Sequence, residues 1–363
     1  MSFPFVQPYF GLGNSLQTAQ ASAAGGGVGG WVELARTTLG SAGDTISVTS
    51  LADKRYYMVL TDGIASGTLY PELEINADTG NNYAYRRSIN GGADSSGGTY
   101  KALFPSNTPV ATGETYFAVD YLANLSAKEK LGISHDVVSE ASGAGVAPSR
   151  QEHASKWTNT SNAINRIDRS EDGAGQYNTN SEVVVLGWDP ADTHTTNFWE
   201  ELGEITIGSA ASSMTSSTFT AKKYLWVQGY IKPDGTDTIT PTLQLGSTTI
   251  DTGSNYATRY SFNGGADSTT TSNDTMEFLY NTGAKGEPIF FNTFIINNAS
   301  NEKLSITKVV AQETAGNTSD PERSEGVGKW TNTSNQANIL KIDQWSGTGN
   351  LGTDSIVKIW GSD

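Results

Sequence analysis

The amino-acid sequence predicts an all-β protein: two tandem, duplicated β-sandwich domains of jelly-roll-like type, preceded by an extended N-terminal arm. Three observations support this fold class. Long stretches of the sequence occur twice, apolar residues follow the short period of β-strands, and glycine with small polar residues separates the apolar runs.

The duplication is clearest in Lys156–Asn162, which recurs without change 173 residues later as Lys329–Asn335. Asn90–Asp94 recurs at the same distance. Earlier in the repeat the distance is 168 residues, so that Trp31 corresponds to Trp199. Copies of this length indicate a domain duplication, because the units of solenoid proteins have only about 20 to 50 residues. The chain therefore divides into an arm at 1–30, a first domain at 31–190, a linker at 191–198 and a second domain at 199–363.

Alternating patterns and short apolar runs predict strands in both copies. They cover Thr45–Val48, Tyr56–Leu60, Leu73–Ile75, Tyr116–Leu122, Leu131–Val138 and Glu182–Trp188, then Ile289–Ile296, Leu304–Val310 and Ser355–Trp360. Segments such as Asn90–Asp94 supply the Asn and Gly residues that accept the positive φ of tight turns. About eight to ten short strands in each half favour a two-layer sandwich or jelly roll, with a small barrel as the nearest alternative.

Composition limits the partners and the chemistry. The formal net charge of -15 would repel the phosphates of nucleic acid, so we expect no nucleic-acid partner. No stretch approaches the ~20 apolar residues of a membrane span, so we expect no membrane insertion, and the N-terminus lacks the features of a secretory signal. The chain has no Cys, which excludes disulfides, thiolate metal sites and a cysteine nucleophile.

The histidines do not follow the duplication. His135 and His153 correspond to Lys308 and Gly326, and His194 has no clear counterpart. A duplicated metal or acid-base site would show its ligands twice. No nucleophile-elbow, phosphate-loop or zinc-protease motif is present either, so we expect no catalytic residue, no metal ligand and no enzymatic activity.

Four carboxylates do recur. Asp94, Glu129, Asp168 and Asp189 match Asp267, Glu302, Asp343 and Asp363. A glycosidase needs two such groups about 5 to 9.5 Å apart, but we expect structural roles in turns and hairpins. No cofactor is expected. Ca²⁺ is the alternative, because it prefers oxygen ligands, although no EF-hand-like array is present.

Tryptophans at repeated positions are expected in the cores: Trp157, Trp330, Trp31 and Trp199. A Trp retained between Lys and Thr in both copies is typical of a sandwich core, with its indole N–H bonded to a turn carbonyl. Exposed rings that bind carbohydrate are the alternative. Trp345 and Tyr100, which have no aromatic counterparts, are better candidates for such contacts.

The N-terminal arm lies outside the repeat and joins aromatic residues to a Gly-rich tract. Its aromatic residues are Phe3, Phe5, Tyr9 and Phe10. Apolar side chains on such a tether cannot bury themselves, so we expect them to bind a neighbouring subunit.

Three segments resemble a recurrent type of uncharacterised structural protein encoded by environmental tailed bacteriophages. They are Trp31–Gly40, Asn81–Arg87 with the following Asn90–Asp94, and Ser181–Pro190. The resemblance covers nearly the whole first copy and, more loosely, the second, where Ser355–Trp360 departs from the apolar run. It implies a virion component, such as a head decoration protein, a head fibre or a tail part, and it transfers no catalytic or binding residue.

We therefore expect a non-enzymatic virion protein, a capsid decoration protein or a head or tail fibre, that assembles in the host cytoplasm. Its partners would be capsid or tail proteins and copies of itself, with the arm as the anchor. A glycan-binding module that recognises a host surface is the second hypothesis. A polysaccharide hydrolase is the third.

Overall fold

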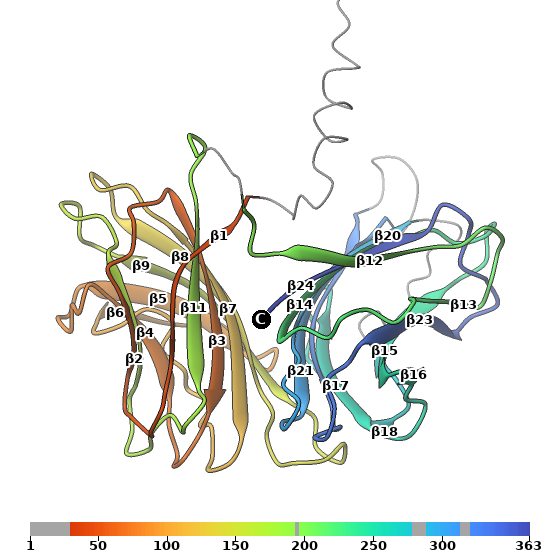
Figure 1. The fold of residues 1–363 in the computed structure, drawn as a ribbon, viewed down its shortest axis with the longest axis horizontal. Helices are drawn as coiled ribbons and strands as arrows, with labels where there is room; N and C mark the ends of the chain where they lie inside the picture. Colours follow the sequence, from red (N-terminus) through yellow and green to blue (C-terminus); the bar gives the residue numbers. More distant parts are fainter. Residues whose placement is uncertain (1–29, 193–195, 278–287, 313–319) are drawn as a thin grey trace, which may run out of the picture.

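The computed structural model describes residues 30–192, 196–277, 288–312 and 320–363. Within these residues all the regular secondary structure is β-strand (Figure 1). The first half contains β1 (Val32–Thr38), β2 (Ile46–Thr49), β3 (Tyr56–Ile64), β4 (Pro71–Ile75), β5 (Tyr83–Ile89), β6 (Ser95–Tyr100), β7 (Thr115–Ala123), β8 (Lys130–Val138), β9 (Ser149–Trp157), β10 (Arg166–Glu171) and β11 (Glu182–Trp188). The second half contains β12 (Glu200–Thr206), β13 (Ser213–Thr215), β14 (Tyr224–Ile231), β15 (Thr240–Ser247), β16 (Thr249–Ile250), β17 (Tyr256–Phe262), β18 (Ser268–Asn273), β19 (Met276–Glu277), β20 (Ile289–Ile296), β21 (Lys303–Ala311), β22 (Glu322–Trp330), β23 (Ile339–Ser346) and β24 (Ile356–Ser362).

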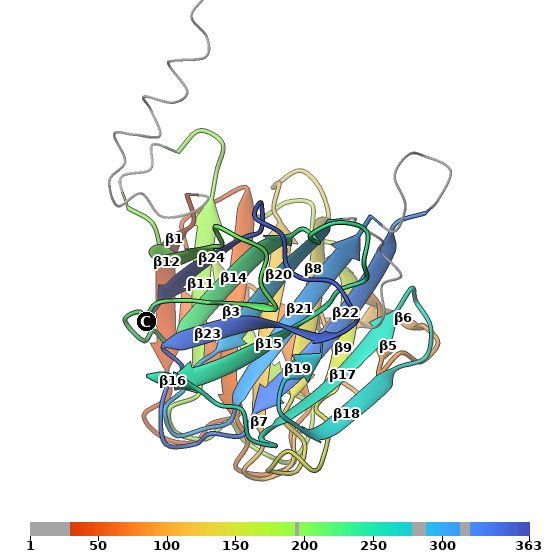
Figure 2. The same cartoon turned by 90° about the vertical axis from the view of Figure 1, so that its right-hand side faces the viewer.

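Each half contains one large and one small antiparallel sheet, which confirms the predicted tandem β-sandwiches. In the first half the large sheet has the order β1-β11-β3-β7-β8-β9-β5-β6 and the small sheet β2-β10-β4. In the second half the large sheet has the order β12-β24-β14-β20-β21-β22-β17-β18, and the small sheet β13-β23-β15-β16, with β19 beside β15. Figure 2 looks onto this small sheet, where β15 and β23 cross in front of the large sheet. The two large sheets match strand for strand.

The repeated Asn-Gly segments form the same tight turn in both halves. Asn90 and Gly91 have φ of 48° and 68°, and Asn263 and Gly264 have φ of 49° and 72°. Positive φ at two successive residues suits the right-handed twist of the flanking strands and favours the Asn-Gly pair. The turns join β5 to β6 and β17 to β18 at the far edges of the large sheets.

Each sandwich has its own core between its large and small sheets, with a buried Trp from the unchanged block. Trp157 lies in the first core and Trp330 in the second. Their indole N–H groups donate to Asp78 Oδ2 and Asp251 Oδ2, each at 2.8 Å. The acceptor is therefore a side-chain carboxylate, and the sequence-based expectation of a turn carbonyl was wrong.

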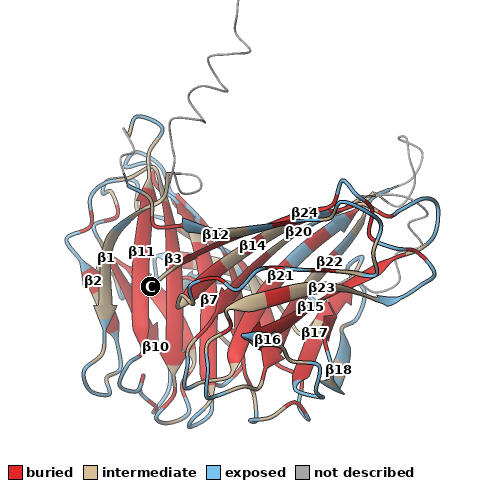
Figure 3. Cartoon of the chain, turned by 45° about the vertical axis from the view of Figure 1, so that its right-hand side comes forward, coloured by how far each residue is buried: buried red, intermediate tan, exposed pale blue. Residues whose placement is uncertain are grey.

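A third hydrophobic core lies between the two large sheets and joins the domains (Figures 1 and 3). The first domain contributes Met58, Leu60, Phe117, Val119, Val137, Val184 and Leu186, and the second Phe198, Trp199, Tyr224, Phe294, Ile296, Leu304, Ile306, Val327 and Trp360. Phe198, which the sequence placed in the linker, is part of this core, and its backbone N–H donates to the carbonyl of Trp31 at 2.7 Å. The four sheets thus form one stacked body.

Ion pairs border this third core. Lys223 Nζ of the second domain lies 3.0 Å from carboxylate oxygens of both Asp62 and Glu182 of the first. Arg150 forms two bonds with the carboxylate of Asp267, at 3.1 and 2.7 Å, and both side chains are almost fully buried. Such pairs fix the register of the two domains, because breaking one leaves an uncompensated buried charge.

Candidate functional site

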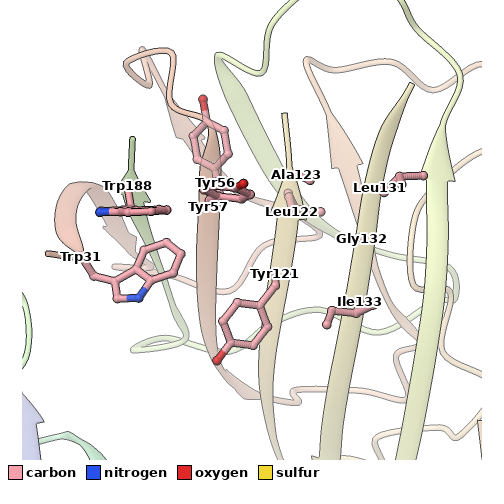
Figure 4. Close-up of a pocket in the computed structure, with 10 residues that line it drawn as sticks. All are labelled: Trp31, Tyr56, Tyr57, Tyr121, Leu122, Ala123, Leu131, Gly132, Ile133 and Trp188. Atoms are coloured by element: carbon pink, nitrogen blue, oxygen red, sulfur yellow. The ribbon is translucent and has the colours of Figure 1, made fainter. Parts of the chain in front are cut away.

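An open apolar groove of about 400 Å³ lies at one end of the first domain's large sheet (Figure 4). It is lined by Trp31, Tyr56, Tyr57, Tyr121, Leu122, Ala123, Leu131, Gly132, Ile133 and Trp188. Tyr56 points to the same face of β3 as Met58 and Leu60, because side chains alternate along a strand. The groove therefore continues the face that carries the third core, beyond the part that the second domain covers.

Aromatic rings dominate one wall of the groove. The rings of Tyr56 and Trp188 are stacked, with centroids 5.3 Å apart and planes at 20°. Trp31 and Tyr121 follow at 6.4 Å and 60°. Burial raises the pKa of Tyr57 to about 12, and its hydroxyl donates to the backbone carbonyl of Ile164 at 3.0 Å. Exposed apolar surface with aromatic rings is typical of places where proteins or flat ligands such as sugar rings bind.

The histidines take positions in the interior. His135 is buried between the domains and lines a cavity of about 210 Å³ with Lys308. Burial, followed by the positive charge of Lys308, holds the pKa of His135 well below its ordinary value, so the ring is neutral. His153 Nε2 lies 3.3 Å from Asp136 Oδ2, also inside the protein. His194 lies outside the described residues.

The repeated carboxylates contact Arg or Lys side chains or backbone N–H groups, which fits structural roles. The contacts are Asp94 with Arg86 (3.4 Å), Glu129 with Lys156 (2.9 Å), Asp168 with Arg166 (2.8 Å), Asp189 with the N–H of Ala191 (3.0 Å), Asp267 with Arg150 (2.7 Å), Glu302 with Lys329 (3.6 Å), Asp343 with Lys341 (2.9 Å) and Asp363 with Lys222 (3.1 Å). In the described part of the chain, no three His, Asp or Glu side chains gather where they could hold a metal ion. The same residues contain no helix that is long and apolar enough to cross a membrane.

The tryptophans that begin the two domains have different surroundings. Trp199 is fully buried in the third core. Trp31 is only partly buried: it packs against the third core and also lines the groove, so it is less enclosed than the core position that we expected. Trp345 is exposed, as the sequence suggested, whereas Tyr100 is partly buried and packs edge-on against Tyr85 at 5.2 Å.

The sequence analysis missed the residues that hold the two core tryptophans. Besides the carboxylates of Asp78 and Asp251, a lysine lies over each indole, with Lys130 Nζ 5.4 Å from the ring of Trp157 and Lys303 at the same place in the second domain. Each lysine also donates to three backbone carbonyls. These residues are 173 positions apart, so the repeat distance itself was the signal that identifies them.

The aromatic residues of the arm, Phe3, Phe5, Tyr9 and Phe10, lie outside the described residues. Their expected role in binding a neighbouring subunit stays a prediction.

No family model matches the chain, and no curated protein matches it at a significant level. Among solved structures, domains LG4-5 of the mouse laminin alpha1 chain align at 10% identity over 92% of this chain and 89% of that chain, with a TM-score of 0.20. A chain from work on the in-meso crystallization of membrane proteins aligns at 9% identity over 79% of this chain and 100% of that chain, with a TM-score of 0.13. At these TM-scores neither likeness carries an argument about function.

Proposed function

We propose that this protein is a non-enzymatic structural component of a tailed-phage particle, a capsid decoration protein or a head or tail fibre. The resemblance of Trp31–Gly40 and Ser181–Pro190 to phage structural proteins supports the proposal. The structural observation that carries it is the open apolar groove on a rigid stack of four sheets, because apolar surface on a rigid body suits lasting contacts between proteins. The arm would then dock this body onto the particle.

The proposal is tested by deleting residues 1–30 from the chain and following its incorporation into particles. The truncated protein should fold, because every strand of both sandwiches begins at Val32 or later, but it should be absent from purified particles. A matched pair of full-length variants locates the effect: Phe3, Phe5, Tyr9 and Phe10 changed to Ser, against Gln7 and Gln17 changed to Ala. Normal incorporation of the truncated chain would refute the anchoring role.

The aromatic groove also favours a second function, the binding of host-surface glycans. Stacked rings such as Tyr56 and Trp188 offer flat apolar faces to a sugar ring. A glycan array with the purified chain should then give selective hits that are lost in Trp188→Ala and kept in Tyr230→Ala, a change of an exposed aromatic residue on the second domain. An array without selective hits would leave the structural role alone.

A further inference from the structure

The two large sheets meet through equivalent strands of the repeat, since β8 contacts β21 and β9 contacts β22. Between them lies a cavity of about 210 Å³, with walls from β7 and β8 of the first domain and from β20 and β21 of the second. Three pairs of its lining residues are equivalent in the repeat: Tyr121 and Phe294, Ile133 and Ile306, and His135 and Lys308. The cavity is therefore formed once, by both copies together.

The aromatic groove leads into this cavity. Tyr121 and Ile133 line both, and Figure 4 shows them side by side on β7 and β8. Leu131 in the groove and His135 in the cavity lie on the same face of β8 as Ile133. Because a strand rises about 3.3 Å per residue, Leu131 and His135 are roughly 13 Å apart along it. A molecule that reaches from the groove into the cavity is therefore elongated.

A basic residue interrupts the same apolar row in both copies. The rows on the facing strands are Leu131, Ile133, His135 and Val137 on β8, and Leu304, Ile306, Lys308 and Val310 on β21. In each row only the third residue is polar. Burying a polar side chain in an otherwise apolar contact costs free energy. Packing alone therefore does not explain a base at this position in both domains.

The His135 side chain is buried without a hydrogen-bond partner among the described residues. It is 5% exposed, and neither of its ring nitrogens forms a hydrogen bond there. Glu152 Oε1 lies 3.8 Å from Nε2, beyond hydrogen-bond reach, and is paired with Arg150 at 3.1 Å. The neutral ring has one N–H to donate. Buried polar groups in proteins are almost always paired, so a ligand atom that accepts this N–H would be stabilised.

Lys308 adds a positive charge to the same cavity. A carboxylate suits the two bases best, because it accepts from the imidazole N–H and from the ammonium group, and charge-assisted hydrogen bonds are stronger than neutral ones. The rest of the ligand would pass Tyr121 and Ile133, which are apolar on the faces that line the groove. Only an apolar chain suits that passage, because a polar one would lose its hydrogen bonds to water.

We propose that the groove and the cavity form one binding site for an unbranched fatty acid. The carboxylate lies between His135 and Lys308, and the chain passes Ile133 and ends on the stacked rings of Tyr56 and Trp188. This inference goes beyond the proposed function, because it assigns a small-molecule ligand to the contact between the domains. It does not depend on assembly into a particle.

The test measures binding to the full-length chain by isothermal titration calorimetry with three probes: decanoate, hexanoate and 1-decanol. Decanoate should bind at one saturable site. Hexanoate is too short to span the groove and the cavity, and 1-decanol has no charge, so each should bind at least about tenfold more weakly. Equal affinity for decanoate and 1-decanol would overturn the proposal, as would the absence of a saturable site for decanoate.

Two variants locate the carboxylate. Lys308→Met and His135→Leu keep apolar bulk and should each weaken decanoate binding about tenfold without weakening that of 1-decanol, whereas Lys308→Arg should retain it. The matched control is Lys341→Met, the same change on β23 in the small sheet of the second domain. Circular dichroism checks the fold, and Lys308 is exposed, so its variants should keep the wild-type spectrum. Unchanged decanoate affinity in Lys308→Met, or an equal loss in Lys341→Met, would refute the assignment.

Discussion

Replacing Asp267 with Ala should loosen the contact between the domains, because its carboxylate neutralises the buried guanidinium of Arg150. Removing one partner of a buried ion pair costs about 3–5 kcal/mol. Arg150 keeps Glu152 at 3.1 Å, on its more exposed side, so we expect a loss near the lower end, about 3 kcal/mol. That is a large share of the ~5–15 kcal/mol by which a folded domain is stable.

Urea unfolding followed by Trp fluorescence measures this loss, since the chain has 8 Trp and several lie in the third core. The matched control is Asp94→Ala, the same change at the equivalent position of the first copy. Asp94 is exposed and paired with an exposed Arg86 at 3.4 Å, so its removal should cost less than about 1 kcal/mol. Equal losses for the two variants would show that the buried pair does not hold the domains together.

Three further predictions concern stability. Burial raises the pKa of Asp78, but its hydrogen bonds, that from Trp157 first, outweigh burial, so the pKa is lower than usual. Trp157→Phe removes this bond and should reduce the free energy of unfolding by about 2–3 kcal/mol at pH 7. The loss should be smaller below pH ~4, where the carboxylate is protonated, and urea titrations at both pH values measure it. Burial raises the pKa of Glu72 to about 7, so the folded protein loses stability as the pH rises from about 4.5 to 7. The free energy of unfolding of Glu72→Gln should therefore be about 1–3 kcal/mol higher than that of the wild type at pH 8, but not at pH 4. Leu304→Ala should cost about 2–5 kcal/mol and Leu131→Ala less than about 1 kcal/mol; similar losses would contradict the assigned burial.

The two sandwiches were predictable because their signals are local. Alternating side chains identify strands such as β7 and β20, and the repeat distance carries each assignment from one copy to the other. The third core was not predictable, because the pairing of Lys223 with Asp62 joins residues far apart in the chain and neither has a local pattern. Trp31 and Trp199 show the same limit, since equal positions in the repeat acquire different burial from their neighbours.

The groove was missed for a similar reason. Tyr56 and Trp188 stack because β3 and β11 pair antiparallel and bring the start of one strand beside the end of the other. No sequence pattern near either residue predicts this contact. The carboxylates that hold the core tryptophans could, in contrast, have been predicted from the sequence. Asp78 and Asp251 are 173 positions apart, the same distance as the tryptophans that they bind.

The core shared by the two large sheets makes the ancestral gene duplication hard to reverse. A gene that lost its second half would produce a domain with Met58 and Phe117 in water, and one that lost its first half would uncover Trp199 and Phe294. Burying such apolar area is worth roughly 25 cal/mol per Å², so either single domain would be less stable and prone to aggregate. Each domain therefore depends on the other for its stability, and selection retains the two domains together.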